Sequence, residues 1–437
     1  MKGTLRTAVA CLAAGALAGM LAAAPASSAW GAGVPAGQAS YSLEDCFQAA
    51  LKRSESLASQ GEVVTQAEER FRQAIGSVLP SVVANGLFTW QNQSASNFSP
   101  SQQNTVKFTA TQPLFQGLRE YAALAETKDM LKSSKLAYQW AALQLWADTS
   151  QAFNLVLSQE KDLADLRNED GLYLDRIRFL RGWLAIGRAQ DTDVLSVQSA
   201  EAQVKAQMEQ VKYQIASARQ MLAFLTGLPA GVALDDTQSL PDPLPARQEY
   251  LASLDQRPDL KAARWNVEAA KQGVWVAWDQ HLPTVSASAD YYAQRPGIYS
   301  DINWDAALSV SMPLFMGGVI ESQARTARSQ ARQAELALSQ ARRMDEQNLN
   351  DGYDKLRYDL TQQEALRQAA DLAHKNYLAE TRNFRRGLVT NLDVLQAMIT
   401  DVTTQQALDT LRYAANTDYQ SLRAQTGQGI QLPSIER

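Results

Sequence analysis

The sequence Gln112-Pro113-Leu114-Phe115-Gln116-Gly117 returns as Met312-Pro313-Leu314-Phe315-Met316-Gly317, 200 positions later. Upstream, Leu79-Pro80 returns as Leu282-Pro283 with a shift of 203, so the second copy is three residues shorter between the two motifs. A surface loop is where such a deletion is tolerated. The agreement indicates an internal duplication with a period of about 200 residues.

A third motif follows the same shift and fixes the domain organisation. Gly187 with Asp193-Val194-Leu195 returns as Gly387 with Asp393-Val394-Leu395, and Thr226-Gly227 returns as Thr426-Gly427. We therefore assign the repeats to residues 30–227 and 248–427, followed by a C-terminal tail at 428–437. Residues 228–247 contain four prolines, which is typical of an extended connector.

The first 29 residues have the three parts of a secretory signal peptide. Lys2 and Arg6 supply the positive charge, and the uncharged stretch that follows is rich in alanine and leucine. Small residues permit cleavage after Ala26 or Ala29. Cys11 has no leucine three residues before it, so we expect no lipid anchor at this cysteine.

The composition of the exported chain excludes several classes of protein. Without the signal, 39 basic residues face 46 acidic ones, and the net charge of −7 argues against a nucleic-acid partner. Only Cys46 remains, so no intramolecular disulfide can form. No later segment has the 18 or so consecutive apolar residues of a membrane helix, so any membrane crossing must use β-strands.

After each Leu-Pro the residue pattern changes from a helical period to a period of two. This alternation predicts strand hairpins at residues 81–112 and 284–312. For example, Val106 and Phe108 alternate with Lys107 and Thr109. A half-buried hairpin in a soluble protein has the same pattern. Because long helical segments flank each hairpin on both sides, the pattern favours a water-filled transmembrane barrel.

Long helices are predicted around the hairpins. Helical arms begin at Ser42 and at Pro258, and the proline-free segments 118–180 and 320–384 would each span about 95 Å as one helix. The returning helices carry a seam with a spacing of 3.5 residues, which is typical of coiled-coil packing. The seam positions are Val204, Met208, Val211, Ile215, Ala218, Leu222 and Leu225 in the first repeat, and Thr404, Leu408, Leu411, Ala415, Asp418 and Leu422 in the second.

Four strands per chain form an open sheet, and lipid does not tolerate its unpaired edges. Several chains must therefore join. Eight strands from two chains would enclose only side chains, whereas twelve strands from three chains leave room for a channel. The expected fold class is mainly α with a small transmembrane β part. Long antiparallel coiled-coil helices form an α-barrel, and four strands per chain contribute to a trimeric twelve-stranded β-barrel.

The paired Pro-Leu-Phe-x-Gly and Gly-x5-Asp-Val-Leu motifs resemble those of the TolC-like outer-membrane efflux proteins, over essentially the whole mature chain. The resemblance implies a homotrimeric exit duct in the outer membrane, with a long periplasmic part, for a tripartite efflux pump or a type I secretion system. The implied partners are outer-membrane lipid, a periplasmic adaptor (membrane fusion protein) and an inner-membrane transporter of the RND or ABC type. Substrates would pass without reaction, so no catalysis and no cofactor are expected. The implied strand-helix turns contain Pro113, Gly117, Pro313 and Gly317.

The resemblance also implies that the helix turns 187–195 and 387–395 form the periplasmic tip. Asp193 and Asp393 would ring the pore constriction, with Gln396 and Phe384 beside them, and rings of carboxylates favour cations. Helix capping by Asp193 and ordinary packing of Phe384 are the alternative roles. The residues expected to dock the adaptor are Gly187, Thr192, Val194, Leu195, Gly387, Leu388, Val394 and Leu395.

Other kinds of site have little support in the sequence. His281 and His374 are the only histidines and lack metal-spaced partners, and no phosphate-binding loop follows a strand. The alternative function is a periplasmic adaptor or another coiled-coil scaffold, which also combines long helices with short strands. An adaptor normally has one helical hairpin, whereas this sequence predicts two strand hairpins at the far ends of its helices. The cargo is not indicated.

Overall fold

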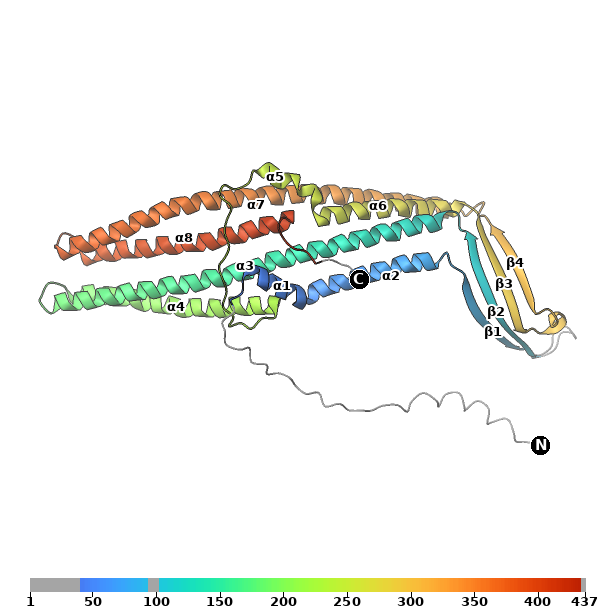
Figure 1. Ribbon diagram of the computed structural model, residues 1–437, viewed down its shortest axis with the longest axis horizontal. Helices are drawn as coiled ribbons and strands as arrows, with labels where there is room; N and C mark the ends of the chain where they lie inside the picture. Colours follow the sequence, from blue (N-terminus) through green and yellow to red (C-terminus); the bar gives the residue numbers. More distant parts are fainter. Residues whose placement is uncertain (1–39, 93–101, 434–437) are drawn as a thin grey trace, which may run out of the picture. The chain divides into compact units, whose positions relative to one another are not determined.

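The computed structural model describes residues 40–92 and 102–433, and the predicted signal peptide at 1–29 lies outside them. The described chain is mainly helical, with one four-stranded sheet (Figure 1). The elements of the first repeat are α1 (Leu43–Arg53), α2 (Glu55–Gly76), β1 (Ser81–Trp90), β2 (Gln102–Phe115), α3 (Arg119–Leu184) and α4 (Asp191–Thr226). Those after the connector are α5 (Arg247–Ala252), α6 (Pro258–Trp278), β3 (Thr284–Gln294), β4 (Trp304–Ser311), α7 (Val319–Arg385) and α8 (Asn391–Thr426), with three short 3₁₀ turns.

The first arm is two helices, where the sequence predicted one. Ser42 caps α1 in a capping box with Asp45, as expected. Ser54 then leaves the helical conformation, and its hydroxyl accepts a hydrogen bond from the Leu57 N–H at 3.2 Å, which starts α2. In α1, before this break, Cys46 is fully buried. The neighbouring Phe47 ring makes an edge-to-face contact with Trp146 in the same core.

The sheet has the order β1-β2-β3-β4, with every neighbouring pair antiparallel. The β2–β3 pair joins the two repeats. Strand β2 is longer than predicted, because it continues to pair with β3 up to Phe115 opposite Val285. Pro113 therefore lies within β2 beside an irregularity in the pairing, and not in the turn. Pro313 does follow its strand, because β4 is an edge strand that ends at Ser311.

The two glycines of the strand-helix turns differ in their surroundings. Both have positive φ, +73° at Gly117 and +61° at Gly317. A Cβ atom at Gly117 would lie 2.8 Å from the carbonyl oxygen of Asp279, whereas one at Gly317 would meet nothing within 4 Å. The first turn therefore lies in close contact with the backbone at the end of α6, whereas the second has free space around its glycine.

The long helices are confirmed as single elements of 66 residues in α3 and 67 in α7, each about 100 Å long. The first seam packs α4 against α3, and four of its members, Val204, Val211, Ala218 and Leu222, are buried. In α8 only Ala415 and Leu422 of the second seam are buried, which agrees with its polar members. No helix among residues 40–92 and 102–433 has the length and apolarity needed to cross a membrane.

A second buried face of α8 holds the two repeats together. Tyr413, Asn416 and Gln420 are buried on this face. The connector crosses here, since Gln238 donates to Asn154 of α3 at 2.7 Å and accepts from Gln420 at 3.4 Å. The connector therefore links both helical hairpins through Gln238, which gives the buried side chains of Asn154 and Gln420 a hydrogen-bond partner.

Candidate functional site

The two helical hairpins turn at their ends through matching backbone geometry. Gly187 and Gly387 have φ values of +71° and +76°. In each turn the next amide donates back into the helix, from Arg188 to Trp183 and from Leu388 to Asn383. A Cβ atom at either glycine would meet nothing within 4 Å. The left-handed backbone, and not space, is therefore what requires glycine at both tips.

The two aspartates of the tips cap the returning helices. One carboxylate oxygen of Asp193 accepts from the Gln190 N–H at 3.0 Å, and one of Asp393 accepts from the Thr390 N–H at 2.8 Å. Hydrogen bonds from the hydroxyl and backbone of Thr390 hold the pKa of Asp393 below its ordinary value. Asp193 therefore contributes to the cap of α4 from the third helical position, whereas the N-cap residue itself is Gln190. A ring of these carboxylates needs further chains and stays a prediction.

A polar link that the sequence did not indicate joins the two hairpins just above the tips. The Arg176 guanidinium on α3 donates twice to the side-chain oxygen of Asn391, at 2.8 and 3.0 Å. The Asn391 amide donates to the backbone oxygen of Asp193 at 3.2 Å. Burial lowers the pKa of Arg176 to about 10, so the guanidinium remains charged at neutral pH. We name this arrangement the Arg176–Asn391 link.

Aromatic side chains cover the Arg176–Asn391 link. The Arg176 guanidinium lies 4.1 Å from the ring centre of Phe384, which stacks on Trp183 with centroids 5.2 Å apart. Phe179 also contacts both rings. Phe384 is only 8% exposed, and its side chain packs from α7 against α3, which is the alternative considered from the sequence. Its place at a pore constriction stays a prediction.

The residues expected to dock a partner fall into two groups. Val194, Val394 and Leu395 are buried among the helices, because their side chains point into the seam. The exposed docking candidates are the two glycines, Thr192, Leu195 and Leu388, and the exposed apolar residues of the tips also include Ile186 and Leu392. The cationic Arg188, Arg385 and Arg386 are exposed beside them. Gln396 is also exposed, on α8.

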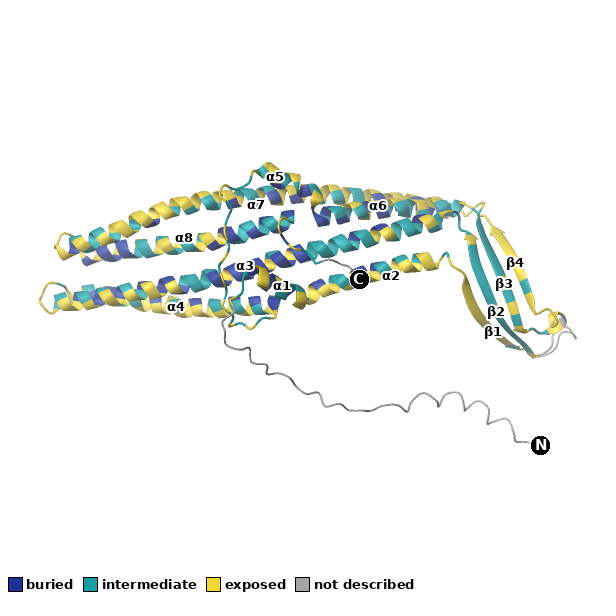
Figure 2. Ribbon diagram, in the orientation of Figure 1, coloured by how far each residue is buried: buried dark blue, intermediate teal, exposed yellow. Residues whose placement is uncertain are grey.

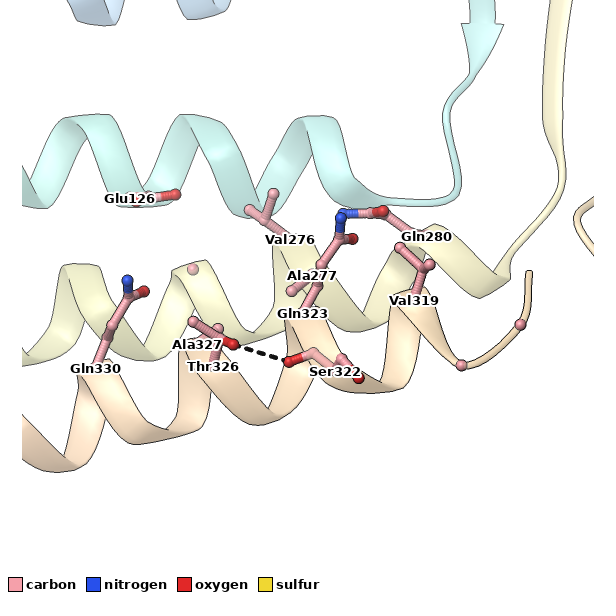
Figure 3. Close-up of a pocket in the computed structure, with 13 residues that line it drawn as sticks. Glu126, Val276, Ala277, Gln280, Val319, Ser322, Gln323, Thr326, Ala327 and Gln330 are labelled. Atoms are coloured by element: carbon pink, nitrogen blue, oxygen red, sulfur yellow. Dashed lines mark hydrogen bonds between the residues drawn. The ribbon is translucent and has the colours of Figure 1, made fainter. Parts of the chain in front are cut away.

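A pocket at the opposite end of the helices is lined by side chains of three helices (Figure 3). It lies among α3, α6 and the start of α7, beside the Gly317–Gly318 turn. Glu126 is the one titratable side chain among the residues that line it, and burial raises its pKa. Thr326 there donates only to the backbone of Ser322 in its own helix. A single carboxyl group without a partner makes no catalytic arrangement.

Comparison with known proteins identifies the family. A family model described as outer membrane efflux protein matches residues 46–228 and 250–428, and each match contains one helix-hairpin-helix unit. The chain belongs to this family. As an outer membrane efflux protein, it is an exit duct through which efflux pumps release their cargo. The members of the family are channels.

Individual relatives of this outer membrane efflux protein are distant. It is 24% identical to the outer membrane protein TolC of Salmonella enteritidis over 366 residues, which is 79% of this chain and 73% of TolC. It is 25% identical to the outer membrane efflux protein BepC of Brucella suis over 324 residues, 70% of this chain and 68% of BepC. The crystal structure of VceC from Vibrio cholerae superposes with a TM-score of 0.78, at 22% identity, over 89% of this chain and 97% of VceC. The fold expected from the sequence is thereby confirmed.

Proposed function

We propose that the chain works as a homotrimer that forms the outer-membrane duct of a tripartite efflux pump or a type I secretion system. The observation that carries the proposal is the open sheet. Strands β1 and β4 each have one unpaired edge, and Figure 2 shows that they are exposed whereas β2 and β3 are partly buried. Three such sheets joined edge to edge close a barrel of twelve strands.

The outer face of the sheet supports this arrangement. Its apolar side chains have no cover among the described residues: they are Val82, Phe88, Trp90, Phe108, Tyr291, Trp304, Leu308 and Val310, and they are 46–71% exposed. A hairpin packed on a soluble core would have buried them. Side chains of this kind on one face, with tyrosine and tryptophan near the strand ends, suit contact with outer-membrane lipid.

The helical part offers a second surface for neighbouring subunits. Tyr213, Met221 and Phe224 lie on the face of α4 that points away from its seam with α3, and they are 75%, 52% and 77% exposed. A row of large apolar side chains is unusual on a free surface. In the trimer we place it against the next subunit, where it closes the wall of the α-barrel.

The tip surface then meets the partners. Its exposed apolar residues, such as Leu195, Leu388 and Leu392, would dock a periplasmic adaptor, which connects the duct to an inner-membrane transporter of the RND or ABC type. Asp193 and Asp393 would ring the aperture in this assembly. The fold needs no cofactor for such a passive conduit.

The trimeric duct is tested by extraction and electrical recording. The protein should require detergent for release from the outer membrane, have the mass of three chains in detergent, and form ion channels in planar bilayers. Deletion of the gene should sensitise cells to a substrate of its pump. A monomer recovered from the soluble periplasm without detergent would instead support the adaptor or scaffold function.

Replacing the two tip glycines tests adaptor docking. Valine in a left-handed conformation costs about 1–2 kcal/mol at each position, so Gly187→Val with Gly387→Val should reshape the turns. We expect about tenfold weaker efflux from trimers that still form, measured by substrate accumulation in cells. The matched control is Gly182→Val, because Gly182 is within α3 and a Cβ there meets nothing within 4 Å. Equal efflux in the tip variant and the control would contradict docking at the turns.

A further inference from the structure

The four strands of the sheet contain very few charges, and those charges lie at one level. Lys107 in β2, Asp290 in β3 and Asp305 in β4 are the only charged residues in the strands as the structure describes them. Arg295 follows directly after β3. The remaining positions on the polar face are mostly threonine, serine, asparagine and glutamine.

Strand register explains why residues so far apart in sequence meet. Asp290 is paired with Thr109 on one side and with Asp305 on the other. Lys107 is paired with Tyr292 in the adjacent row. The charged side chains therefore form a band across three strands, about 20 Å from the helical end of β3, given the rise of a β-strand.

The band is held by direct contacts. The Lys107 ammonium lies 2.7 Å from a carboxylate oxygen of Asp290, which also accepts from the Tyr292 hydroxyl at 3.4 Å. The other oxygen of Asp290 accepts from the Thr109 hydroxyl. Arg295 lies 3.5 Å from Asp305. Each cation in the band is thus matched with one anion.

The pairs keep access to water and to an aromatic surface. The Arg295 guanidinium lies 4.0 Å from the ring centre of Tyr292. The side chain of Asp305 is 46% exposed and that of Lys107 is 29% exposed, so neither pair is sealed from solvent. The band lies on the face opposite Phe108, Tyr291 and Trp304. In a barrel with lipid on its apolar face, this polar face lines the water-filled lumen.

We propose that Lys107, Asp290, Arg295 and Asp305 form a charge-balanced belt that sets the ion selectivity of the barrel lumen. This inference rests on the proposed trimeric duct, in which the belt occurs three times around the pore. Because its charges sum to zero, the belt opposes neither cations nor anions as a whole. A solute with both signs of charge, such as a zwitterion, finds a partner for each. Removing one member leaves a net charge of one per chain and of three per trimer, which favours ions of the opposite sign.

The test measures reversal potentials of purified trimers in planar bilayers under a potassium chloride gradient. A unit charge several ångströms from the ion path changes local ion concentrations about twofold or more, even in water. Lys107→Gln should therefore raise the cation-to-anion permeability ratio about twofold or more, and Asp290→Asn should lower it by a similar factor. The double variant, which restores charge balance, should return close to the original ratio. Lys52→Gln, on α1 and outside the strands, is the control with the same charge change and no expected effect.

Loss of channel formation and an unchanged permeability ratio would contradict different proposals. If the unmodified protein forms no channels, the trimeric duct fails. If it forms channels but Lys107→Gln and Asp290→Asn leave the ratio unchanged, the belt is overturned. Should those two variants fail to assemble, Asp305→Asn on the edge strand leaves the Lys107–Asp290 pair intact and should lower the ratio. An unchanged ratio in that variant also overturns the belt.

Discussion

Replacement of Arg176 with methionine is expected to raise the time-averaged conductance of the trimer in planar bilayers about tenfold. The Arg176–Asn391 link joins the first hairpin to the second beside the tips, through two hydrogen bonds from a buried guanidinium. A hydrogen bond to a charged group contributes about 1.5–3 kcal/mol, and 1.4 kcal/mol is a factor of ten in an equilibrium. Methionine keeps contact with Phe384 but cannot hold Asn391, so the hairpins should separate more often.

A variant of Asn391 should change the conductance in the opposite direction. Asn391→Asp would lose the hydrogen bond from the Asn391 amide to the Asp193 backbone oxygen, but it would place a carboxylate against the guanidinium. Because a hydrogen bond between two charged groups is about twice as strong as a neutral one, we expect the variant to lower the conductance. Arg178→Met is the control, because Arg178 is on the same helix, 77% of its side chain is exposed, and it pairs with Asp175 within α3. If neither Arg176→Met nor Asn391→Asp changes conductance beyond this control, the link does not hold the tip closed.

The duplication explains why the fold was predictable from one sequence. Each change from a helical period to a period of two is marked by a Leu-Pro, and each appears twice, so strands and long helices were placed to within a few residues. Two boundaries were wrong: β2 runs beyond Pro113, which suggested its end, and the first arm is broken at Ser54. Proline lacks an N–H group, but a pairing irregularity beside Pro113 lets β2 continue along β3.

The polar contacts between the repeats could not be predicted. Comparison of the repeats reveals what they share, whereas the link at the tips is made by residues that differ: Asn376 stands in the position equivalent to Arg176, and Asp191 in that of Asn391. The second face of α8 was hidden for another reason. Its buried Gln420 looks like a surface residue in the sequence, because its polar partner Gln238 is brought to that face only by the path of the connector.

Replacement of Arg257 with methionine should destabilise the protein by about 3–5 kcal/mol. This arginine, 2% exposed, is the N-cap residue of α6 and lies 2.7 Å from Asp259 and 2.9 Å from Asp345 of α7. Its guanidinium also lies 4.7 Å from the ring centre of Trp140 in α3. Removing one partner of a buried ion pair costs about 3–5 kcal/mol, because the remaining charges lose their compensation. The trimer should therefore melt at a clearly lower temperature.

A matched variant separates burial from loss of charge. Arg264 is on α6 and pairs with Asp255 at the surface, where the two side chains are 44% and 49% exposed. Exposed pairs contribute about 0–1 kcal/mol, so Arg264→Met should leave the melting temperature almost unchanged. Equal melting of the two variants would show that the Arg257 cluster does not hold α3, α6 and α7 together.

The decrease in melting temperature caused by Arg257→Met should depend on pH. Burial, together with the nearby Asp259, raises the pKa of Asp345 to about 6 despite the attraction of Arg257. The folded state then binds this proton more tightly than the unfolded state, so stability from this group rises as pH falls from about 7 towards 4. Without Arg257 the pKa of Asp345 should rise further.

The decrease in melting temperature caused by Arg257→Met should therefore be larger at pH 8 than at pH 5. Adding Asp345→Asn should make this decrease smaller at pH 8. An equal decrease at both pH values would mean that the substitution destabilises the protein through lost packing on Trp140, and not through an uncompensated carboxylate.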